Sequence, residues 1–429
     1  MKDAANASDD QRKPLKEHFR QVRETTERLA QPLVIEDYGL QAMGDVSPPK
    51  WHLAHTTWFF ETFVLLPYMP GYRVFHPEFA RLFNSYYETL GKFWPRPLRG
   101  LLSRPTVEEV YRYRQVITEA VERLIDQADV AVFPRLDDIV VLGIHHEQQH
   151  QELFMTDIKY NLSINPLKPA YLPHRESEPR QTATAEWSSF PGGLVEIGHN
   201  GEGFGFDNEL PRHRQWLDPF RMQDRLVTNG EFLAFMQDQG YHTPTLWLSL
   251  GWAQIQKEHW EAPLYWENHD GQWFRYTLAG MKPVVLEEPV CHISYFEADA
   301  YARWAQKRLV REAEWEIAAW DRDPERGNFL EEGWLDPKPA EPQTGELRQM
   351  FGDVWEWTES AYTPYPGYRP QEGALGEYNG KFMSGQQVLK GGSTVTPKNH
   401  IRATYRNFFP PEARWQFSGI RLAEDASHE

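Results

Sequence analysis

Cysteine is nearly absent from this chain of 429 residues, which contains a single one, Cys291. One thiol cannot form a disulfide within the chain or supply the several thiolates of a cysteine-rich metal cluster. Basic residues are also scarce, because 45 Lys and Arg stand against 62 Asp and Glu, which gives a formal net charge of −17. Nucleic acids and anionic membranes bind basic surfaces. The sequence therefore predicts no nucleic acid and no membrane as a partner.

Long apolar segments are missing as well. No uninterrupted apolar run approaches the ~18 residues that a membrane-spanning helix needs. The N-terminal segment MKDAANASDDQRK lacks the apolar core of a signal peptide, and we expect residues 1–13 to form a disordered tail on a cytoplasmic protein. Aromatic residues are abundant instead, with 17 Trp, 19 Tyr and 24 Phe. Such a chain can line a pocket with rings, although most of the rings are expected in the core.

Helical periodicity runs through residues 14–165. Apolar side chains recur there at helical intervals in four segments, each with one face suited to burial. Four helices joined by short connections are typical of an antiparallel bundle. The expected inward residues are Leu15, Phe19, Val22 and Leu29; Trp51, His55, Trp58, Thr62 and Leu65; Val107, Val110, Ile117, Val121 and Leu124; and Ile139, Leu142, His146, His150, Leu153 and Asp157.

The composition and the hydrophobic pattern of the sequence change after the helical half. Residues 166–186 hold four prolines among polar residues, which favours a linker. From 187 to 429, short apolar runs alternate with glycine and proline, and two of the few expected helices start at capping boxes, residues 228–231 and 294–297. The sequence therefore predicts two domains of class α plus α+β: a helical bundle over 14–165 and an irregular α+β domain over 187–429.

Three histidines form the strongest chemical signal. His146 and His150 are four residues apart on a predicted helix, so both rings lie on one face about one turn apart. His55 occupies the inward face of another predicted helix. Three imidazoles with open coordination positions would form a reactive metal site rather than a structural one. The alternative is that all three are ordinary core or surface histidines.

The same segment also fits the zinc-protease pattern H-E-x-x-H, in which the glutamate, here Glu147, acts as a general base. The extended form of that pattern requires a glycine and a third histidine shortly afterwards. Leu153 and Thr156 stand at those positions. The protease interpretation is therefore the weaker one.

Three further groups could take part in catalysis or substrate binding. Tyr86 and Tyr87 could supply a phenol proton, and Arg96 and Arg99 could clamp a carboxylate. The run YRNFFPP at 405–411 combines an amide with two rings and could hold a quaternary ammonium by cation–π contact. Each group also has a structural explanation, as packing tyrosines, surface arginines or a buried aromatic turn.

Together these motifs resemble the iron-dependent sulfoxide synthases of ergothioneine biosynthesis, the EgtB family. The helical half is similar to a DinB-type four-helix bundle, with WHLAH at 51–55 and HHEQQHQEL at 145–153. The second half is similar to a formylglycine-generating-enzyme or sulfatase-modifying-factor domain, an irregular α+β fold of the C-type-lectin kind. Its matching segments are FDNELPRH at 206–213, SYFEADAYARWAQKRLVREAEWE at 294–316, GDVWEWT at 352–358, LKGGS at 389–393 and RNFFPPEARWQFSGIRLA at 406–423.

The resemblance implies a non-haem Fe(II) enzyme that uses O2. Such an enzyme joins a thiol to the imidazole C2 of hercynine, the trimethylated histidine betaine, and oxidises the sulfur. The implied iron ligands are His55, His146 and His150. The implied substrate contacts are Gln149 and Asn407 to hercynine, Phe408 and Phe409 in the hercynine pocket, and Arg96 and Arg99 to the carboxylate of cysteine.

The identity of the thiol rests on the tyrosine pair. Tyr86 and Tyr87 resemble the active-site tyrosines of the branch of the family that uses cysteine, in which a tyrosine donates a proton or hydrogen atom. The other branch uses γ-glutamylcysteine and has an aspartate near the position of Phe409. The resemblance therefore favours cysteine, and it leaves open which tyrosine acts.

Other functions stay open. One is the same chemistry on unmethylated histidine, as in ovothiol synthesis, although those chains commonly carry a methyltransferase domain that this sequence does not show. Another is a DinB-type thiol transferase with a divalent metal and no O2 chemistry, and a third is a metal-stabilised binding module. Formylglycine generation itself is excluded, since it requires a pair of cysteines. The sequence also leaves open whether the chain forms a homo-oligomer.

Overall fold

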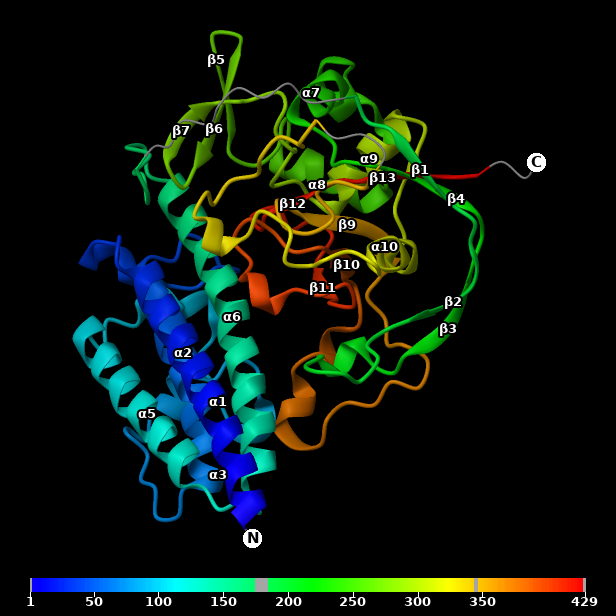
Figure 1. Ribbon diagram of the computed structural model, residues 1–429. Helices are drawn as coiled ribbons and strands as arrows, with labels where there is room; N and C mark the ends of the chain where they lie inside the picture. The colour runs from blue at the N-terminus through cyan, green and yellow to red at the C-terminus, as the bar shows by residue number, and fades with distance from the viewer. Residues whose placement is uncertain (1, 174–183, 343–345, 427–429) are drawn as a thin grey trace. The chain divides into compact units, whose positions relative to one another are not determined.

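The chain folds into two compact units in the structure, a computed structural model (Figure 1). The described residues are 2–173, 184–342 and 346–426. One unit consists of Met1–Leu167 with Gly373–Leu375, and the other of Lys168–Glu372 with Gly376–Glu429. The predicted linker, 166–186, spans this division, and its residues 174–183 lie outside the described part. None of the described helices has the length and apolar content that crossing a membrane requires.

Four long helices build the first unit, as the periodicity predicts (Figure 1). Helices α1 and α2 each pack against both α5 and α6. Helix α1 begins at Lys2 and so includes most of the segment 1–13, for which the sequence predicts a disordered tail. The helices are α1 (Lys2–Ala30), α2 (Pro49–Phe60), α3 (Leu66–Tyr68), α4 (Phe79–Phe83), α5 (Val107–Gln127) and α6 (Phe133–Ser163).

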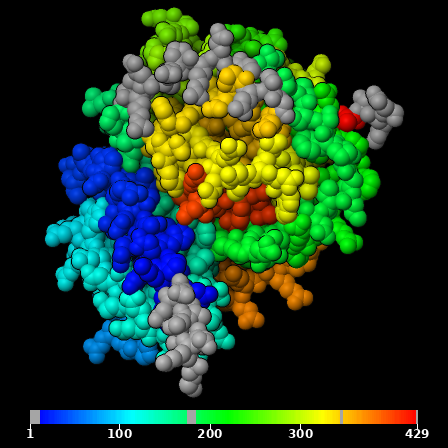
Figure 2. All heavy atoms as spheres, viewed as in Figure 1, coloured from blue at the N-terminus to red at the C-terminus, as the bar shows by residue number. Residues whose placement is uncertain are grey.

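Two of these helices show how the sequence directs burial. Helix α1 buries Leu15, Phe19 and Val22 at intervals of four and three, and its opposite side lies on the viewed surface in Figure 2, in blue. Helix α2 buries every residue except Lys50, so it has no solvent-exposed face. It is the central helix of the bundle, and a π-helical turn, Glu61–Leu65, follows it directly.

Short strands and long connections make up the second unit, as its glycine- and proline-rich sequence predicts. The sheets have the orders β1-β4-β13-β8, β11-β10-β9-β12, β2-β3 and β5-β6-β7. The strands are β1 (Trp187–Phe190), β2 (Gly193–Ile197), β3 (His213–Leu217), β4 (Phe220–Gln223), β5 (Trp266–His269), β6 (Gln272–Thr277), β7 (Gly280–Pro283), β8 (Arg308–Leu309), β9 (Trp355–Ala361), β10 (Gln387–Lys390), β11 (Asn407–Phe409), β12 (Ser418–Gly419) and β13 (Leu422–Asp425). The sheet β1-β4-β13-β8 joins the first and last strands of the unit.

The helices of the second unit confirm both predicted capping boxes. Thr228 caps one helix and Ser294 caps another, and each side chain accepts from the backbone N–H of the glutamate three residues later. The helices are α7 (Asn229–Gln237), α8 (Ser249–Glu258), α9 (Tyr295–Trp304) and α10 (Glu312–Ala319).

A buried ion pair connects distant loops of this unit. Arg421 donates two hydrogen bonds to the carboxylate of Glu356, at 2.8 and 3.0 Å, and neither side chain is more than 1% exposed. Arg421 also donates to the backbone oxygens of Arg348 and Gln349. Because breaking one partner of such a pair leaves an uncompensated buried charge, this contact holds β9, the segment before it and the segment between β12 and β13 in one arrangement.

Candidate metal centre

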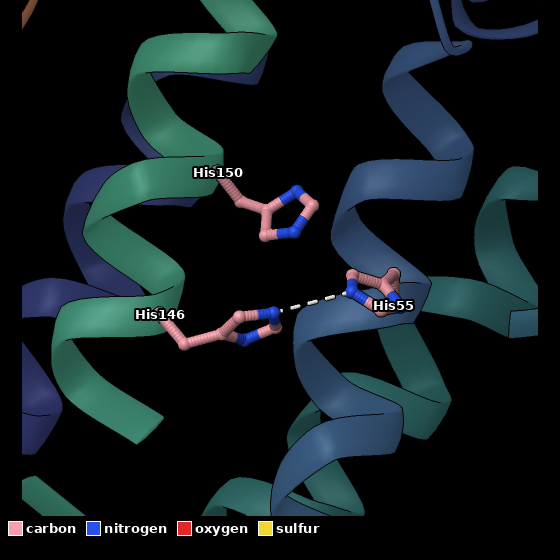
Figure 3. A group of neighbouring side chains, drawn as sticks. All are labelled: His55, His146 and His150. Atoms are coloured by element: carbon pink, nitrogen blue, oxygen red, sulfur yellow. Dashed lines mark hydrogen bonds between the residues drawn. The ribbon is translucent and has the colours of Figure 1, made fainter. Parts of the chain in front are cut away.

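The candidate metal centre lies on α2 and α6, which pack against each other. Helix α6 presents His146 and His150 one turn apart, and α2 presents His55 toward them (Figure 3). The backbone N–H of Ser47, just before α2, donates to the carboxylate of Asp157 on α6 at 2.8 Å. This bond connects the start of α2 to the side of α6. It therefore helps to hold together the two helix faces that carry the histidines.

Three imidazole rings converge between the two helices. Nitrogen atoms of His55, His146 and His150 lie within 4.8 Å of one another. The Nε2 atoms of His55 and His146 are 3.3 Å apart (Figure 3). His55 is 0% exposed and His146 is 2% exposed. The structure thus brings together the three histidines that the sequence singles out on two different helices.

Burial keeps these rings neutral. It lowers the pKa of His146 to about 3. Burial, reinforced by the neighbouring rings, also holds the pKa of His55 and that of His150 well below the ordinary value. A neutral imidazole has one nitrogen lone pair, which is the form that binds a metal. In His55, the Nδ1–H donates to the backbone oxygen of Phe83 at 2.5 Å, so the lone pair is on Nε2, which faces His146.

This donor set fits a divalent transition metal such as Fe(II). Imidazole nitrogens suit iron, and three protein ligands would leave coordination positions open. Aromatic rings hold the imidazoles in place: Trp51 stacks on His55 with ring centres 4.4 Å apart, and Phe59 stacks on His146 at 4.5 Å. This packing fixes the orientation of the His55 and His146 rings.

Sequence reasoning missed His52 and assigned no role to Asp157 beyond the inward face of its helix. The Nδ1 atom of His52 lies 3.0 Å from Nδ1 of His150, and its Nε2 atom lies 3.0 Å from the carboxylate of Asp157. A signal was present in the segment WHLAH, because His52 and His55 are three residues apart and so lie on the same side of a helix.

Glu147, the candidate general base of the H-E-x-x-H pattern, is engaged by other helices. It accepts hydrogen bonds from Arg23 and Thr26 of α1, at 2.8 and 2.6 Å, and from Arg114 of α5. Burial alone would raise the pKa of Glu147, but Arg114 and Arg23 outweigh it and hold that pKa at about 2. A carboxylate that is ionised and committed to two guanidinium groups is a poor proton acceptor. The zinc-protease interpretation fails on this point.

Replacing Glu147 with glutamine is expected to lower the free energy of unfolding by about 3–5 kcal/mol, because Arg23 loses its carboxylate partner and Arg114 keeps only the exposed Glu27. Denaturant unfolding at neutral pH measures this loss. The pKa of Glu147 is depressed in the folded state, so its contribution is complete above the unfolded carboxyl pKa and disappears as the pH falls towards 2. The wild type should lose stability on acidification more steeply than the variant, and parallel pH profiles would contradict this role.

Tyr86 and Tyr87 lie between α4 and α5, near the histidines. Tyr87 is 0% exposed, and its ring centre lies 5.8 Å from that of Trp58, which stacks on His55 at 5.6 Å. Tyr86 is less buried and its ring lies 4.7 Å from that of Tyr87. Asn84 fixes the turn, since its side chain accepts from the N–H of Tyr87 and donates to the backbone oxygen of the same residue.

The two candidate arginines differ in their surroundings. Arg99 is 3% exposed, and its guanidinium carbon lies 3.4 Å from the ring centre of Trp51. Trp51 is the ring that stacks on His55. Arg96 is exposed and donates to the backbone oxygen of Asp45. The structure therefore places Arg99, and not Arg96, in the interior of the first unit.

The predicted hercynine contacts fall in different units. Gln149 lies on α6 between the ligand histidines, whereas Asn407, Phe408 and Phe409 form β11 of the second unit. Adjacent strand residues point to opposite faces. Phe408 stacks on Tyr362 with ring centres 4.1 Å apart, so Asn407 and Phe409 share the other face of β11.

Comparison with known proteins identifies the family. Residues 18–154 match the DinB superfamily, and residues 173–339 and 336–426 match the sulfatase-modifying factor enzyme 1-like domain. The chain is 30% identical over 444 aligned residues to a hercynine oxygenase of Mycolicibacterium thermoresistibile, across 96% of this chain and 95% of that one. The chain belongs to the hercynine oxygenase family. A second hercynine oxygenase, of Mycolicibacterium smegmatis, is 35% identical across 66% of this chain and 71% of its own.

These matches confirm the predicted fold class, a DinB-type helical domain followed by a formylglycine-generating-enzyme-like α+β domain. As a member of the hercynine oxygenase family the chain is an enzyme. It is also 29% identical to the formylglycine-generating enzyme of Streptomyces coelicolor, across 58% of this chain and 91% of that one. Its single cysteine, Cys291, is buried.

Proposed function

We propose that this hercynine oxygenase family member is a non-haem Fe(II)- and O2-dependent sulfoxide synthase. It joins cysteine to the imidazole C2 of hercynine and gives hercynylcysteine sulfoxide, a step of ergothioneine biosynthesis. The observation that carries the proposal is the convergence of three neutral imidazoles within 4.8 Å on the rigid helices of a family member. His55, His146 and His150 would hold the iron through these nitrogens.

The proposed reaction balances with O2 as the only oxidant. Forming the C–S bond removes one hydrogen from the imidazole C2 and one from the thiol, and oxidising the sulfide to a sulfoxide removes two further electrons. One O2 accepts all four electrons: one oxygen atom ends on sulfur and the other leaves as water. A bound Fe(II) would supply the position where thiolate, imidazole and O2 meet.

The chain's own residues would supply positioning and a proton. Tyr87 or Tyr86 would donate a proton from its phenol oxygen during the reaction, since Tyr87 packs against Trp58, which stacks on His55, and Tyr86 packs against Tyr87. Gln149 and Asn407 would contact hercynine, and Phe409, on the same face of β11 as Asn407, is better placed than Phe408 to line the hercynine pocket.

Arg99 is the residue best suited to hold the carboxylate of cysteine. Its guanidinium donates to the hydroxyl oxygens of Ser47 and Ser85, at 2.9 and 3.2 Å, and these neutral groups do not compensate its charge. Burial, reinforced by the nearby Arg96, lowers the pKa of Arg99 well below its usual value, and the negative charge of Asp157 offsets this only in part. A substrate carboxylate would provide the missing negative charge in a charge-assisted hydrogen bond.

Replacing Arg99 with methionine is expected to raise the KM for cysteine by about 10- to 100-fold, the usual effect of losing one charged hydrogen-bond partner. Methionine keeps apolar packing on Trp51 while removing the charge. The KM for hercynine should change far less, and Arg96→Met, at the exposed position, serves as the matched control. Steady-state kinetics with each substrate varied in turn measure both constants, and equal effects of the two substitutions on the KM for cysteine would refute the assignment.

Anaerobic reconstitution with Fe(II) followed by air tests the function as a whole. Hercynine is supplied with either cysteine or γ-glutamylcysteine, and O2 uptake and products are followed by an oxygen electrode and mass spectrometry. We expect hercynylcysteine sulfoxide with one O2 consumed per product. Sulfoxide formed only with γ-glutamylcysteine would keep the reaction and reassign the thiol. Absence of sulfoxide with both thiols would overturn the proposal.

The same assay separates the alternatives. Turnover of unmethylated histidine in preference to hercynine would indicate ovothiol-type chemistry. Thiol transfer without O2 uptake would indicate a DinB-type transferase, and ligand binding without turnover would indicate a binding module.

A further inference from the structure

We propose that His52 and Asp157 form a hydrogen-bonded relay that sets the tautomer and the ring orientation of His150 as a metal ligand. The inference rests on the proposed function in one respect only, that His150 binds the metal. His52 and Asp157 are then positioning residues, which act on the metal through His150.

The direction of each hydrogen bond in the relay follows from chemistry. The Oδ2 atom of Asp157 accepts hydrogen bonds, so the Nε2–H of His52 donates to it across the 3.0 Å contact. A neutral His52 then carries its lone pair on Nδ1, and this lone pair accepts the Nδ1–H of His150, also at 3.0 Å. His150 is left with its lone pair on Nε2, which is the nitrogen available to a metal.

The far end of the relay is anchored. The same oxygen of Asp157 that accepts from His52 also accepts the backbone N–H of Ser47 at 2.8 Å. His52 and Asp157 are each 2% exposed, so bulk water does not compete for these bonds. Asp157 and His150 both lie on α6, and His52 reaches them from α2. The relay therefore holds the two ligand-bearing helices in register at the level of the metal centre.

Two of the three ligand rings would thus be oriented by different kinds of hydrogen-bond partner. His55 uses a backbone oxygen, that of Phe83, which no substitution removes. His150 uses side chains, which can be changed one at a time. Partners that orient a metal-bound histidine typically account for about 10- to 100-fold in metal affinity. Disrupting the relay should therefore weaken metal binding by a similar factor, which can be measured without enzyme activity.

Two amide substitutions of His52 test the two hydrogen bonds of the relay separately. His52→Asn keeps a hydrogen-bond acceptor near the position of Nδ1, where His150 donates. His52→Gln extends its amide towards the position of Nε2, near Asp157, and loses the acceptor for His150. The readouts are the Fe(II) dissociation constant under anaerobic conditions and the d–d absorption bands of the Co(II)-loaded protein. Thermal unfolding of the metal-free proteins checks that each variant is folded.

We expect His52→Gln to weaken Fe(II) binding about 10- to 100-fold and to shift the Co(II) bands. His52→Asn should stay close to the wild type, and His242→Asn, at an exposed position of the second unit, should match it. If His52→Gln does not fold, His52→Leu fills the space without any acceptor and should show the same loss. A folded variant lacking the acceptor that keeps the wild-type affinity and Co(II) spectrum would overturn the relay. Failure of the proposed iron site is distinguishable, because His150→Ala would then retain its metal.

Discussion

Replacing His150 with alanine is expected to abolish stoichiometric Fe(II) binding and, with it, formation of hercynylcysteine sulfoxide. The substitution leaves His55 and His146, whose Nε2 atoms face each other at 3.3 Å, as the remaining imidazole pair. Loss of a residue that only orients a ligand already costs about 10- to 100-fold in metal affinity, so loss of a ligand should cost more than about 100-fold. Anaerobic loading, desalting and metal analysis measure the iron retained per chain.

The matched control is His242→Ala, which removes an exposed imidazole from the second unit and should retain iron like the wild type. The fold should survive the substitution of His150, because alanine is favoured in the interior of a helix such as α6. Circular dichroism and thermal unfolding verify this. A folded His150→Ala protein that keeps close to one iron per chain would contradict the assignment of this histidine.

Tyr87→Phe is expected to divert the product from the sulfoxide to cysteine sulfinate. The change removes only the hydroxyl from a ring that is 0% exposed and that packs against Trp58, beside His55. Loss of a positioned proton donor should slow C–S bond formation by about 10²- to 10⁴-fold. Oxidation of the thiol alone would then consume O2, place both oxygen atoms on sulfur and leave hercynine unchanged.

Mass spectrometry of sulfoxide, sulfinate and recovered hercynine, each per O2 consumed, measures the diversion. Tyr86→Phe is the paired variant, since its ring lies 4.7 Å from that of Tyr87 but is less buried. A diversion seen only with Tyr86→Phe would assign the proton to that residue. An unchanged ratio of products in both variants would reject a proton donor in this pair.

Parts of both units could be predicted because their signals are local. Helical periodicity needs only the sequence of each segment, and it places His146 and His150 on one face of α6 without reference to any other helix. The capping boxes at Thr228 and Ser294 are equally local, because donor and acceptor are three residues apart. His55 required a further assumption, that two inward faces meet, which the packing of α2 against α6 satisfies.

The remaining features depend on contacts between distant segments. Glu147 resembles a general base in sequence, but Arg23 and Arg114, from two other helices, commit it to an ion pair. The relay from Asp157 to His150 passes through His52 on a different helix, so no spacing within α6 reveals it. Such pairings follow from how the helices pack, and a periodic pattern does not encode them.

The arginines and the β11 residues illustrate a second limit. Arg96 and Arg99 look equivalent in the segment WPRPLRG, yet only Arg99 stacks on Trp51 in the interior. Phe408 and Phe409 are adjacent and similar, but strand geometry sends their rings to opposite faces of β11. The burial of each arginine and the sheet face of each phenylalanine depend on the backbone conformation of a few residues. These segments are too short to contain a repeating pattern that predicts it.

X-ray absorption spectroscopy of the anaerobic, Fe(II)-loaded protein is the most direct test of whether three imidazoles share one iron. We expect one iron per chain with scattering from three imidazole rings, from His55, His146 and His150, whose nitrogens already lie within 4.8 Å of one another. The His55→Ala protein, loaded with excess Fe(II), should show one imidazole fewer or no ordered iron. An iron without imidazole scattering, or identical spectra for the wild type and His55→Ala, would contradict a metal centre at these residues.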